Sequence, residues 1–399
     1  SGSKNASLPI LAATLLSDKK ISLTNLPKVK DIETMILLLK SLGSSIESSK
    51  KKLIINNNKQ KKTFAAYSLV KTMRAGILVL GPLIAKFGKA KISLPGGCAI
   101  GTRPVDIHLK ALSKLGVKYK INQGYVYANA PKGLVGANIK FPKISVGATE
   151  NLIIASCLAT GKTILSNCAI EPEIKDLVNF LTEMGCNIKW ISKRTIMIEG
   201  ARKLNEVKYR IMPDRIEAGT YLIAAALNEG DLKIVGIDPK IINKEISILK
   251  KIGAKIIQKK NEILIQGNKK IKSINIKTSP YPGFPTDLQA QMMVLLCKAS
   301  KKSYIKEEIF ENRFMHVAEL NRMGAKISIS GNRATIEGNI KFEAAELMAT
   351  DLRASVSLIL AALTSKGKSI INRIYHLDRG YENIEKKLKK VGAKIRRIN

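Results

Sequence analysis

The sequence predicts an α/β protein with two domains, each built from three similar repeats. Three observations support this fold class. A glycine directly after a predicted helix recurs about every 70 residues. Six short helices are apolar on nearly every side, and alternating strands follow the glycines. The 399 residues are enough for two or three domains of about 100–200 residues each.

The recurring glycines are Gly43, Gly116, Gly185, Gly253, Gly324 and Gly392. Glycine is common just past the C-terminus of a helix because it adopts positive φ without strain. A short alternating strand follows, often with a turn and a second strand, as at 255–257 with 262–266 and at 326–328 with 333–337. We therefore place the domains at residues 4–212 and 213–399.

The six apolar helices are expected at 6–16, 75–87, 148–160, 216–227, 288–299 and 352–364. A helix that is apolar around its whole circumference is buried on all sides, so these helices should form the two cores.

The N-terminal ends of the apolar helices carry polar and charged residues. We find Lys4-Asn5, Arg74, Thr149-Glu150, Asp214-Arg215, Thr286-Asp287 and Thr350-Asp351 with Arg353. Asp and Thr are expected there as caps. Basic residues at a positive helix end are unfavourable unless an anion is bound nearby, so these ends should converge on a negatively charged ligand.

Composition excludes several classes of protein. No apolar run reaches the ~18 residues of a membrane-spanning helix, and no signal peptide opens the chain. Five cysteines without a CxxC spacing and three histidines argue against a disulfide scaffold or a metal centre. The net charge of +37 is spread along the chain, which favours small anionic substrates over nucleic acid.

The stretch 93–108 contains residue types that occur in catalytic sites. Cys98 follows Pro95-Gly96-Gly97, and Arg103, Asp106 and His108 come soon after. A glycine-rich loop that offers a thiol as nucleophile or acid, with an arginine for an anion, suits catalysis. The alternative is an ordinary turn with a small apolar cysteine.

Further motifs are spread over the chain: Lys4-Asn5-Ala6, Thr72-Met73-Arg74-Ala75, Ser145-Val146-Gly147-Ala148-Thr149, Glu171-Pro172-Glu173, Pro213-Asp214-Arg215-Ile216-Glu217, Gly283-Phe284-Pro285-Thr286-Asp287, Phe310-Glu311-Asn312-Arg313, Ala349-Thr350-Asp351-Leu352-Arg353 and Tyr375-His376-Leu377-Asp378-Arg379-Gly380-Tyr381. With the cysteine loop, they make the chain resemble the UDP-N-acetylglucosamine 1-carboxyvinyltransferases, a family of enolpyruvyl transferases. The resemblance implies a pair of inside-out α/β barrels built from six repeats, as in 5-enolpyruvylshikimate-3-phosphate (EPSP) synthase.

The resemblance also implies an activity. Phosphoenolpyruvate adds to the 3′-hydroxyl of UDP-N-acetylglucosamine through a tetrahedral ketal, phosphate leaves, and peptidoglycan synthesis begins. No metal or organic cofactor is needed. The enzyme would act in the bacterial cytoplasm, where it supports cell shape and division and is the target of fosfomycin.

Site residues follow from the resemblance alone. Cys98 corresponds to the proton donor, which also attacks phosphoenolpyruvate, and Asp287 to the base; Lys4, Arg103 and Arg379 complete the catalytic set. Phosphoenolpyruvate is expected to contact Lys4, Asn5, Arg103, Arg353 and Arg379. The UDP-sugar is expected to contact Arg74, Arg103, Pro104, Val105, Asp106, Ile107, Lys143, Ser145, Val146, Asp287 and Ile309. Arg313 and Asp214 are expected to order the site through ion pairs, and His376 to shape it.

Two alternatives remain open. EPSP synthase shares the fold but lacks a Pro-Gly-Gly-Cys loop, so Cys98 argues against it. A non-catalytic UDP-sugar-binding relative is the other. Family chains normally begin well before the Lys-Asn motif, with strands of the C-terminal domain; only three residues precede Lys4 here, so we expect those strands to be missing.

Overall fold

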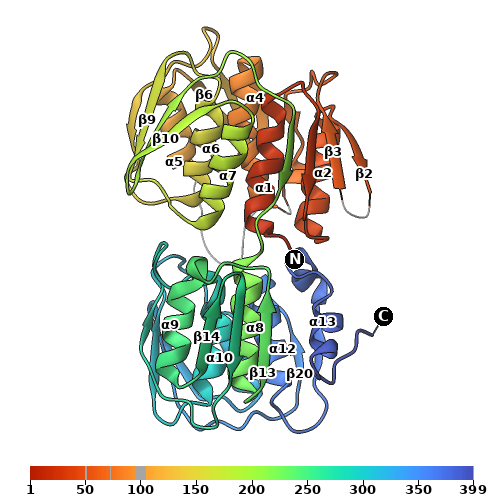
Figure 1. The fold of residues 1–399 in the computed structure, drawn as a ribbon, viewed down its shortest axis with the longest axis vertical. Helices are drawn as coiled ribbons and strands as arrows, with labels where there is room; N and C mark the ends of the chain where they lie inside the picture. The colour runs from red at the N-terminus through yellow and green to blue at the C-terminus, as the bar shows by residue number, and fades with distance from the viewer. Residues whose placement is uncertain (50–51, 72, 95–104, 399) are drawn as a thin grey trace. The chain divides into compact units, whose positions relative to one another are not determined.

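A computed structural model of the chain describes residues 1–49, 52–71, 73–94 and 105–398 (Figure 1). The described residues form two compact units, of which unit 1 ends at Met212 and unit 2 begins at Pro213. Each unit has its own hydrophobic core.

Three buried helices form the centre of unit 1. They are α1 (Lys4–Ala13), which continues as η1 (Thr14–Leu16); α4 (Leu80–Phe87), which follows η2 (Arg74–Val79); and α6 (Val146–Ser156). Helix α4 packs against α6, and η2 packs against α1. All residues of α1 from Ala6 onward are buried, which confirms the prediction of a helix without an exposed face.

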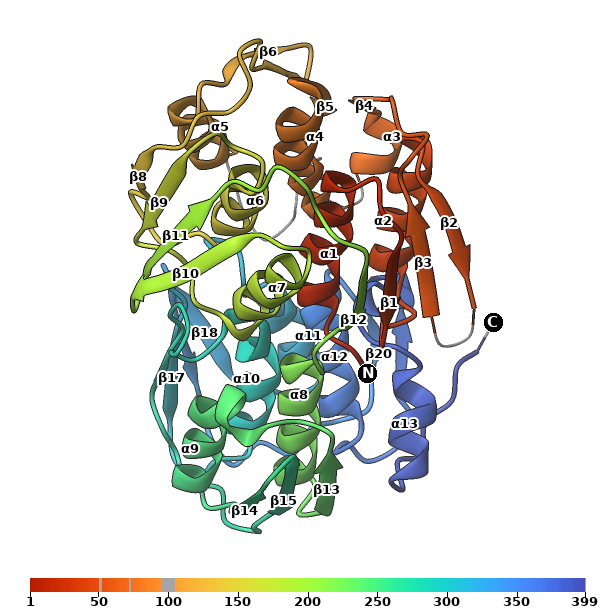
Figure 2. The same cartoon turned by 45° about the horizontal axis from the view of Figure 1, so that its top comes forward.

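Outer helices and three sheets cover this centre. The helices are α2 (Lys30–Ser41), α3 (Tyr67–Val70), α5 (Asp106–Lys114) and α7 (Pro172–Glu183). The sheets have the orders β12-β1-β3-β2, β4-β5-β7-β6 and β10-β11-β9-β8. Their strands are β1 (Ile21–Thr24), β2 (Ser45–Ser48), β3 (Lys52–Asn56), β4 (Phe64–Ala65), β5 (Lys89–Ser93), β6 (Lys118–Asn122), β7 (Tyr125–Asn129), β8 (Asn138–Lys140), β9 (Lys162–Ser166), β10 (Asn187–Ser192), β11 (Thr195–Glu199) and β12 (Val207–Arg210). Figures 1 and 2 show α1, α6 and α7 packed side by side.

Unit 2 repeats the arrangement. Its buried helices are α8 (Arg215–Leu227), α10 (Gln289–Cys297), which follows η4 (Thr286–Leu288), and α12 (Leu352–Ala362). Helix α10 packs against both α8 and α12. The outer helices are η3 (Pro239–Ile242), α9 (Asn243–Ile252), α11 (His316–Arg322), η5 (Ile374–Arg379) and α13 (Ile384–Lys390).

The sheets of unit 2 have the orders β13-β15-β14, β16-β17-β19-β18 and β20-β21. Their strands are β13 (Asp231–Val235), β14 (Lys255–Lys259), β15 (Glu262–Gln266), β16 (Ile276–Lys277), β17 (Ser303–Lys306), β18 (Ile327–Ser330), β19 (Arg333–Ile336), β20 (Glu346–Met348) and β21 (Ile370–Asn372). The two strand pairs predicted in this half, β14 with β15 and β18 with β19, are confirmed as antiparallel pairs.

Parallel pairs enclose the buried helices. The strand before the helix pairs in parallel with the strand after it for β4 with β5, β8 with β9, β16 with β17 and β20 with β21. Such a crossover lays the helix on one face of its sheet. In unit 2 the start of η4 and the first turn of α12 come together in this way, since Asp287 and Arg353 form an ion pair.

The glycine prediction is confirmed. All six repeat glycines have positive φ, from 88° at Gly324 to 120° at Gly253. A residue without a side chain lets the chain turn sharply at the end of each outer helix. A strand follows the first five glycines as predicted, whereas residues 393–398, after Gly392, form no strand.

Three predicted helix starts were two residues too late: α1 begins at Lys4, α6 at Val146 and η4, which leads into α10, at Thr286. The cap of α6 is Ser145, so Thr149 and Glu150 lie inside the helix. The Ser145 hydroxyl accepts a hydrogen bond from the Ala148 backbone N–H at 3.3 Å, and Thr149 instead donates from its hydroxyl to the Ser145 carbonyl. Serine satisfies the first free N–H groups of a helix, which favours the earlier start of α6.

Within the described ranges, every helix is too short or too polar to cross a bilayer.

Candidate functional site

Two arginines hold Asp287 at the start of the central helix pair η4–α10. Its carboxylate pairs with Nη2 of Arg313 at 3.0 Å through Oδ1 and with Nη2 of Arg353 at 2.7 Å through Oδ2. Both arginines are 6% exposed, whereas the Asp287 side chain is 26% exposed. Charge-assisted hydrogen bonds of this kind fix both the position and the orientation of a carboxylate. Asp287 is therefore held rigidly at the surface of unit 2, with solvent on one side.

The loop that carries Asp287 is tied to a second buried carboxylate. Glu307 is 2% exposed and accepts hydrogen bonds from the hydroxyls of Thr278 at 2.8 Å and Thr286 at 2.9 Å. It also accepts from the backbone N–H groups of Ile309 at 2.8 Å and Phe310 at 3.2 Å. Glu307 thus joins the segment before Asp287 to the segment that carries Ile309, which is half-buried.

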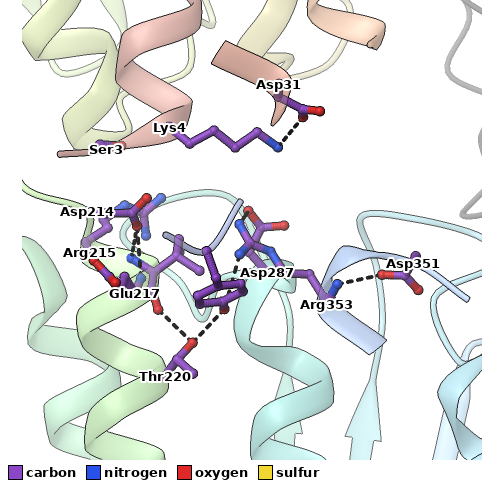
Figure 3. Close-up of polar contacts among 12 residues, drawn as sticks. Ser3, Lys4, Asp31, Asp214, Arg215, Glu217, Thr220, Asp287, Asp351 and Arg353 are labelled. Atoms are coloured by element: carbon purple, nitrogen blue, oxygen red, sulfur yellow. Dashed lines mark hydrogen bonds and ion pairs between the residues drawn. The ribbon is translucent and has the colours of Figure 1, made fainter. Parts of the chain in front are cut away.

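Arg353 lies in the first turn of α12 next to its own helix cap. Asp351 Oδ1 accepts hydrogen bonds from the backbone N–H groups of Arg353 at 2.8 Å and Ala354 at 3.1 Å. Burial alone would lower the pKa of the Arg353 guanidinium, but the acidic groups around it, Asp287 foremost, together outweigh burial and raise the pKa. The side chain therefore stays positively charged (Figure 3).

Two histidines, His316 and His376, lie within electrostatic range of Asp351. Burial lowers the pKa of His316 to about 4, against the opposing effect of Asp351. Burial and then the positive charge of Arg379 lower the pKa of His376. Arg379 is the last residue of η5 and is half-buried. Both imidazoles are therefore neutral at pH 7, and the net positive charge here comes from the arginines.

In unit 1, Lys4 opens α1 and pairs with Asp31 of α2. The distance from Nζ to Oδ2 is 2.7 Å, and the two side chains are 13% and 6% exposed (Figure 3). Ser3 caps the helix by accepting a hydrogen bond from the Ala6 backbone N–H at 3.2 Å. Asn5 follows in the first turn and is half-buried. The cation of Lys4 is thus held at the helix start by a buried carboxylate.

The remaining predicted residues of unit 1 also lie at helix starts. Arg74 is the first residue of η2 and is half-buried. Asp106 and Ile107 open α5, directly after Val105. Lys143 and Val146 are exposed on either side of the α6 cap, Ser145. Cys98, Arg103 and Pro104 lie outside the described residues.

The expected aspartate caps are present in unit 2: the carboxylates of Asp214 and Asp351 accept the first N–H groups of α8 and α12. A carboxylate cap offsets the positive end of its helix. In unit 2 the attraction for an anion must therefore come from side chains such as Arg379 and Arg353. Asp214 acts as this cap, while Arg313 forms the expected ion pair with Asp287.

Sequence reasoning missed two supporting groups. Glu307 sits in a Lys-Glu-Glu run that looks like exposed surface. Asp31 looks like an ordinary first-turn acid of α2. Charge in an otherwise apolar pattern was the only signal for either, and it does not distinguish a buried acid from an exposed one. No group of three or more potential metal ligands occurs in the described part of the chain.

Residues 1–388 match the family model described as EPSP synthase (3-phosphoshikimate 1-carboxyvinyltransferase). Curated relatives are UDP-N-acetylglucosamine 1-carboxyvinyltransferases. The protein from Pelagibacter ubique is 86% identical over 399 residues, covering 100% of this chain and 96% of the relative. That from Geotalea uraniireducens is 51% identical over 398 residues, covering 100% and 95%.

Solved structures have the same fold. The enolpyruvyl transferase NikO from Streptomyces tendae superimposes with a TM-score of 0.90 at 22% identity, covering 99% of this chain and 94% of that one. An EPSP synthase from Acinetobacter baumannii gives 0.77 at 18% identity, covering 100% and 96%. These likenesses establish the EPSP synthase-like two-domain α/β fold.

The fold and the family match together define a carboxyvinyltransferase of the EPSP synthase class. Within that class, the chain belongs to the UDP-N-acetylglucosamine 1-carboxyvinyltransferase family.

Proposed function

We propose that the protein transfers the enolpyruvyl group of phosphoenolpyruvate to the 3′-hydroxyl of UDP-N-acetylglucosamine and releases phosphate. The observation that carries the proposal is the carboxylate of Asp287, held by two buried arginines yet open to solvent on one side. A carboxylate in a fixed position can accept the hydroxyl proton as a general base. Family membership supplies the substrates.

The proposed reaction has two stages. In the first, the sugar 3′-oxygen bonds to C2 of phosphoenolpyruvate, Asp287 takes the hydroxyl proton, and the Cys98 thiol protonates C3. In the second, the Cys98 thiolate takes a proton from C3, the bond from C2 to the phosphate oxygen breaks and the double bond re-forms, while Asp287 gives its proton to the departing phosphate. Atoms and charge balance without a metal or an organic cofactor.

Cationic side chains are proposed to hold the anionic substrate. Lys4, Arg103 and Arg379, with Asn5 and Arg353, would bind the phosphate and carboxylate of phosphoenolpyruvate. Guanidinium groups suit this task because they bind both oxygens of such an anion at once.

A second set of residues is proposed to contact the UDP-sugar. On unit 1 the residues are Arg74, Arg103 to Ile107, Lys143, Ser145 and Val146, and on unit 2 they are Asp287 and Ile309. The positions of Lys143 and Val146 beside the α6 cap support this assignment, because exposed residues at a helix start can reach a ligand.

The biological role follows from the reaction. The product would feed peptidoglycan synthesis in the bacterial cytoplasm, so loss of activity would disturb cell shape and division. The thiol of Cys98 would make the enzyme a target of fosfomycin.

The test is an assay of phosphate release by the purified protein. With phosphoenolpyruvate and UDP-N-acetylglucosamine we expect catalytic release of phosphate and an enolpyruvyl ether detectable by mass spectrometry. With shikimate 3-phosphate as acceptor we expect none. Turnover only with shikimate 3-phosphate would reassign the substrate, and UDP-sugar binding without phosphate release would identify a non-catalytic relative.

A further inference from the structure

A chain of buried polar groups lies beneath Asp287 in unit 2. It joins Thr220 of α8, Gln291 of α10 and Arg353 of α12 to Tyr381, which follows η5. Arg353 Nη1 donates to the Tyr381 hydroxyl at 3.3 Å, and Gln291 Nε2 donates to the same oxygen at 3.2 Å. The hydroxyls of Tyr381 and Thr220 are 2.8 Å apart. Each of the three central helices of the unit thus contributes to this network.

The number of protons on the Thr220 hydroxyl determines which group donates in the hydrogen bond between Thr220 and Tyr381. The Thr220 hydroxyl donates to the Ile216 carbonyl at 2.9 Å, and it has a single proton to give (Figure 3). In its bond with Tyr381, Thr220 is therefore the acceptor and Tyr381 the donor. The proton of Tyr381 points toward α8, which leaves its lone pairs facing Arg353 and Gln291.

Tyr381 can keep this role at any physiological pH. It is 2% exposed, and burial raises the pKa of its phenol, so the proton is retained. Thr220 is 1% exposed and Gln291 is 0% exposed. A phenol hydroxyl in such a setting costs free energy unless all its hydrogen bonds are made. A phenylalanine would fill the same space without that cost, so core packing alone does not explain the hydroxyl.

Two residues, Arg353 and Gln291, connect the network to Asp287. Arg353 connects Tyr381 to the Asp287 carboxylate, because its Nη1 bonds the phenol while its Nη2 pairs with Oδ2 at 2.7 Å. Gln291 connects Tyr381 to the Asp287 backbone, because its Nε2 also donates to the Asp287 carbonyl at 3.0 Å. The phenol oxygen is the point where both connections meet.

We infer that Tyr381 is a positioning residue: its hydroxyl, oriented by Thr220, sets the Arg353 guanidinium and through it the Asp287 carboxylate in the geometry that the reaction requires. The inference rests on the proposed role of Asp287. Tyr381 is not among the residues proposed to contact either substrate, and it acts through Arg353.

The test compares two Tyr→Phe variants in the phosphate-release assay. Tyr381→Phe should lower kcat about tenfold, the effect expected from removing a hydrogen bond to a charged group, while the KM for UDP-N-acetylglucosamine stays within about twofold. Thr220→Val, which keeps the shape but removes the acceptor, should lower kcat in the same direction.

Tyr221→Phe is the matched control. Tyr221 neighbours Thr220 on α8, and its buried hydroxyl oxygen has no hydrogen-bond partner among the described residues. This variant should keep wild-type kcat. A loss of kcat equal to that of Tyr381→Phe would mean that any phenol in this core matters, and the inference would fail.

A double-mutant cycle separates positioning from general stability. If Tyr381 acts through Arg353, Tyr381→Phe should add less than about twofold in an Arg353→Lys background, because effects through a shared contact are not additive. Multiplicative losses, or a Tyr381→Phe enzyme with wild-type kcat, would overturn the inference. Absence of turnover in the wild-type protein would instead defeat the proposed function, so the two failures are distinguishable.

Discussion

Thr286, the residue before Asp287 in the chain, donates a 2.9 Å hydrogen bond from its hydroxyl to the buried carboxylate of Glu307. Through this contact, the segment that presents Asp287 is attached to the end of the β17 strand rather than to its own helix alone. The local stability of the site therefore depends on an acid that has no part in the proposed chemistry.

Glu307→Gln should weaken this attachment. A glutamine offers one acceptor oxygen where Glu307 accepts from two hydroxyls and two backbone N–H groups. Leaving buried donors unsatisfied costs about 1–3 kcal/mol, so the free energy of unfolding measured in urea should fall by that amount. Glu308→Gln is the control, because Glu308 only pairs with Lys277 and Lys306 on the surface; its denaturation midpoint should not move. Equal effects for the two variants would mean that Glu307 does not hold the segment that presents Asp287.

Asp287→Asn should separate binding from chemistry. The amide keeps the size of the carboxylate but cannot take a proton, and it loses the charge that pairs with Arg313 and Arg353. Turnover should fall at least about 100-fold, as expected for loss of a general base, while calorimetry still detects UDP-N-acetylglucosamine binding. Asp238→Asn, at the exposed start of η3, should behave like wild type. If Asp287→Asn instead abolishes binding, Asp287 holds the ligand and is not the base.

Fosfomycin should modify a single cysteine. Burial raises the pKa of the Cys168 and Cys297 thiols to about 12, so both stay protonated at neutral pH, and Cys157 and Cys186 are buried as well. Only a thiolate attacks an epoxide efficiently. Intact-mass analysis should therefore find one adduct per chain, mapped to Cys98. Cys98→Ser should form no adduct and lose most turnover at neutral pH, and a second labelled cysteine would contradict the expected selectivity.

The two deeply buried histidines should titrate far below their usual range. Burial lowers the pKa of His108 and of His316 to about 4. The chain has three histidines, so NMR titration with His→Gln variants for assignment can follow each imidazole. A midpoint near 6.5 for either one would show that it is accessible to water in the folded protein.

These histidines also predict the sign of a stability change. Their pKa in the folded chain lies below the unfolded value of about 6.5, so between pH 6.5 and 4 the unfolded chain binds more protons. The free energy of unfolding should therefore fall as pH falls through this window. Asp176 acts in the opposite sense, because burial raises its pKa to about 6. The comparison of wild type with His316→Gln isolates the histidine contribution: the variant should lose less stability on acidification.

Much of the architecture could be predicted because it is encoded by neighbouring residues. Gly253 marks a helix end because only glycine takes its φ of 120° without strain, and the same reasoning holds at each repeat. Helix α10 could be predicted as buried because its apolar residues leave no polar face. The assignments of Cys98 and Arg103 remain predictions, since both lie outside the described residues.

The contacts around Asp287 could not be predicted from local patterns. Arg353 lies 66 positions from Asp287 in the chain, and Tyr381 lies 161 positions from Thr220. Residue type and spacing determined that acids and arginines stand at helix starts, but folding decided which of them meet. The physical reason is that backbone conformation depends on adjacent residues, whereas a hydrogen-bond partner depends on how whole helices pack against one another.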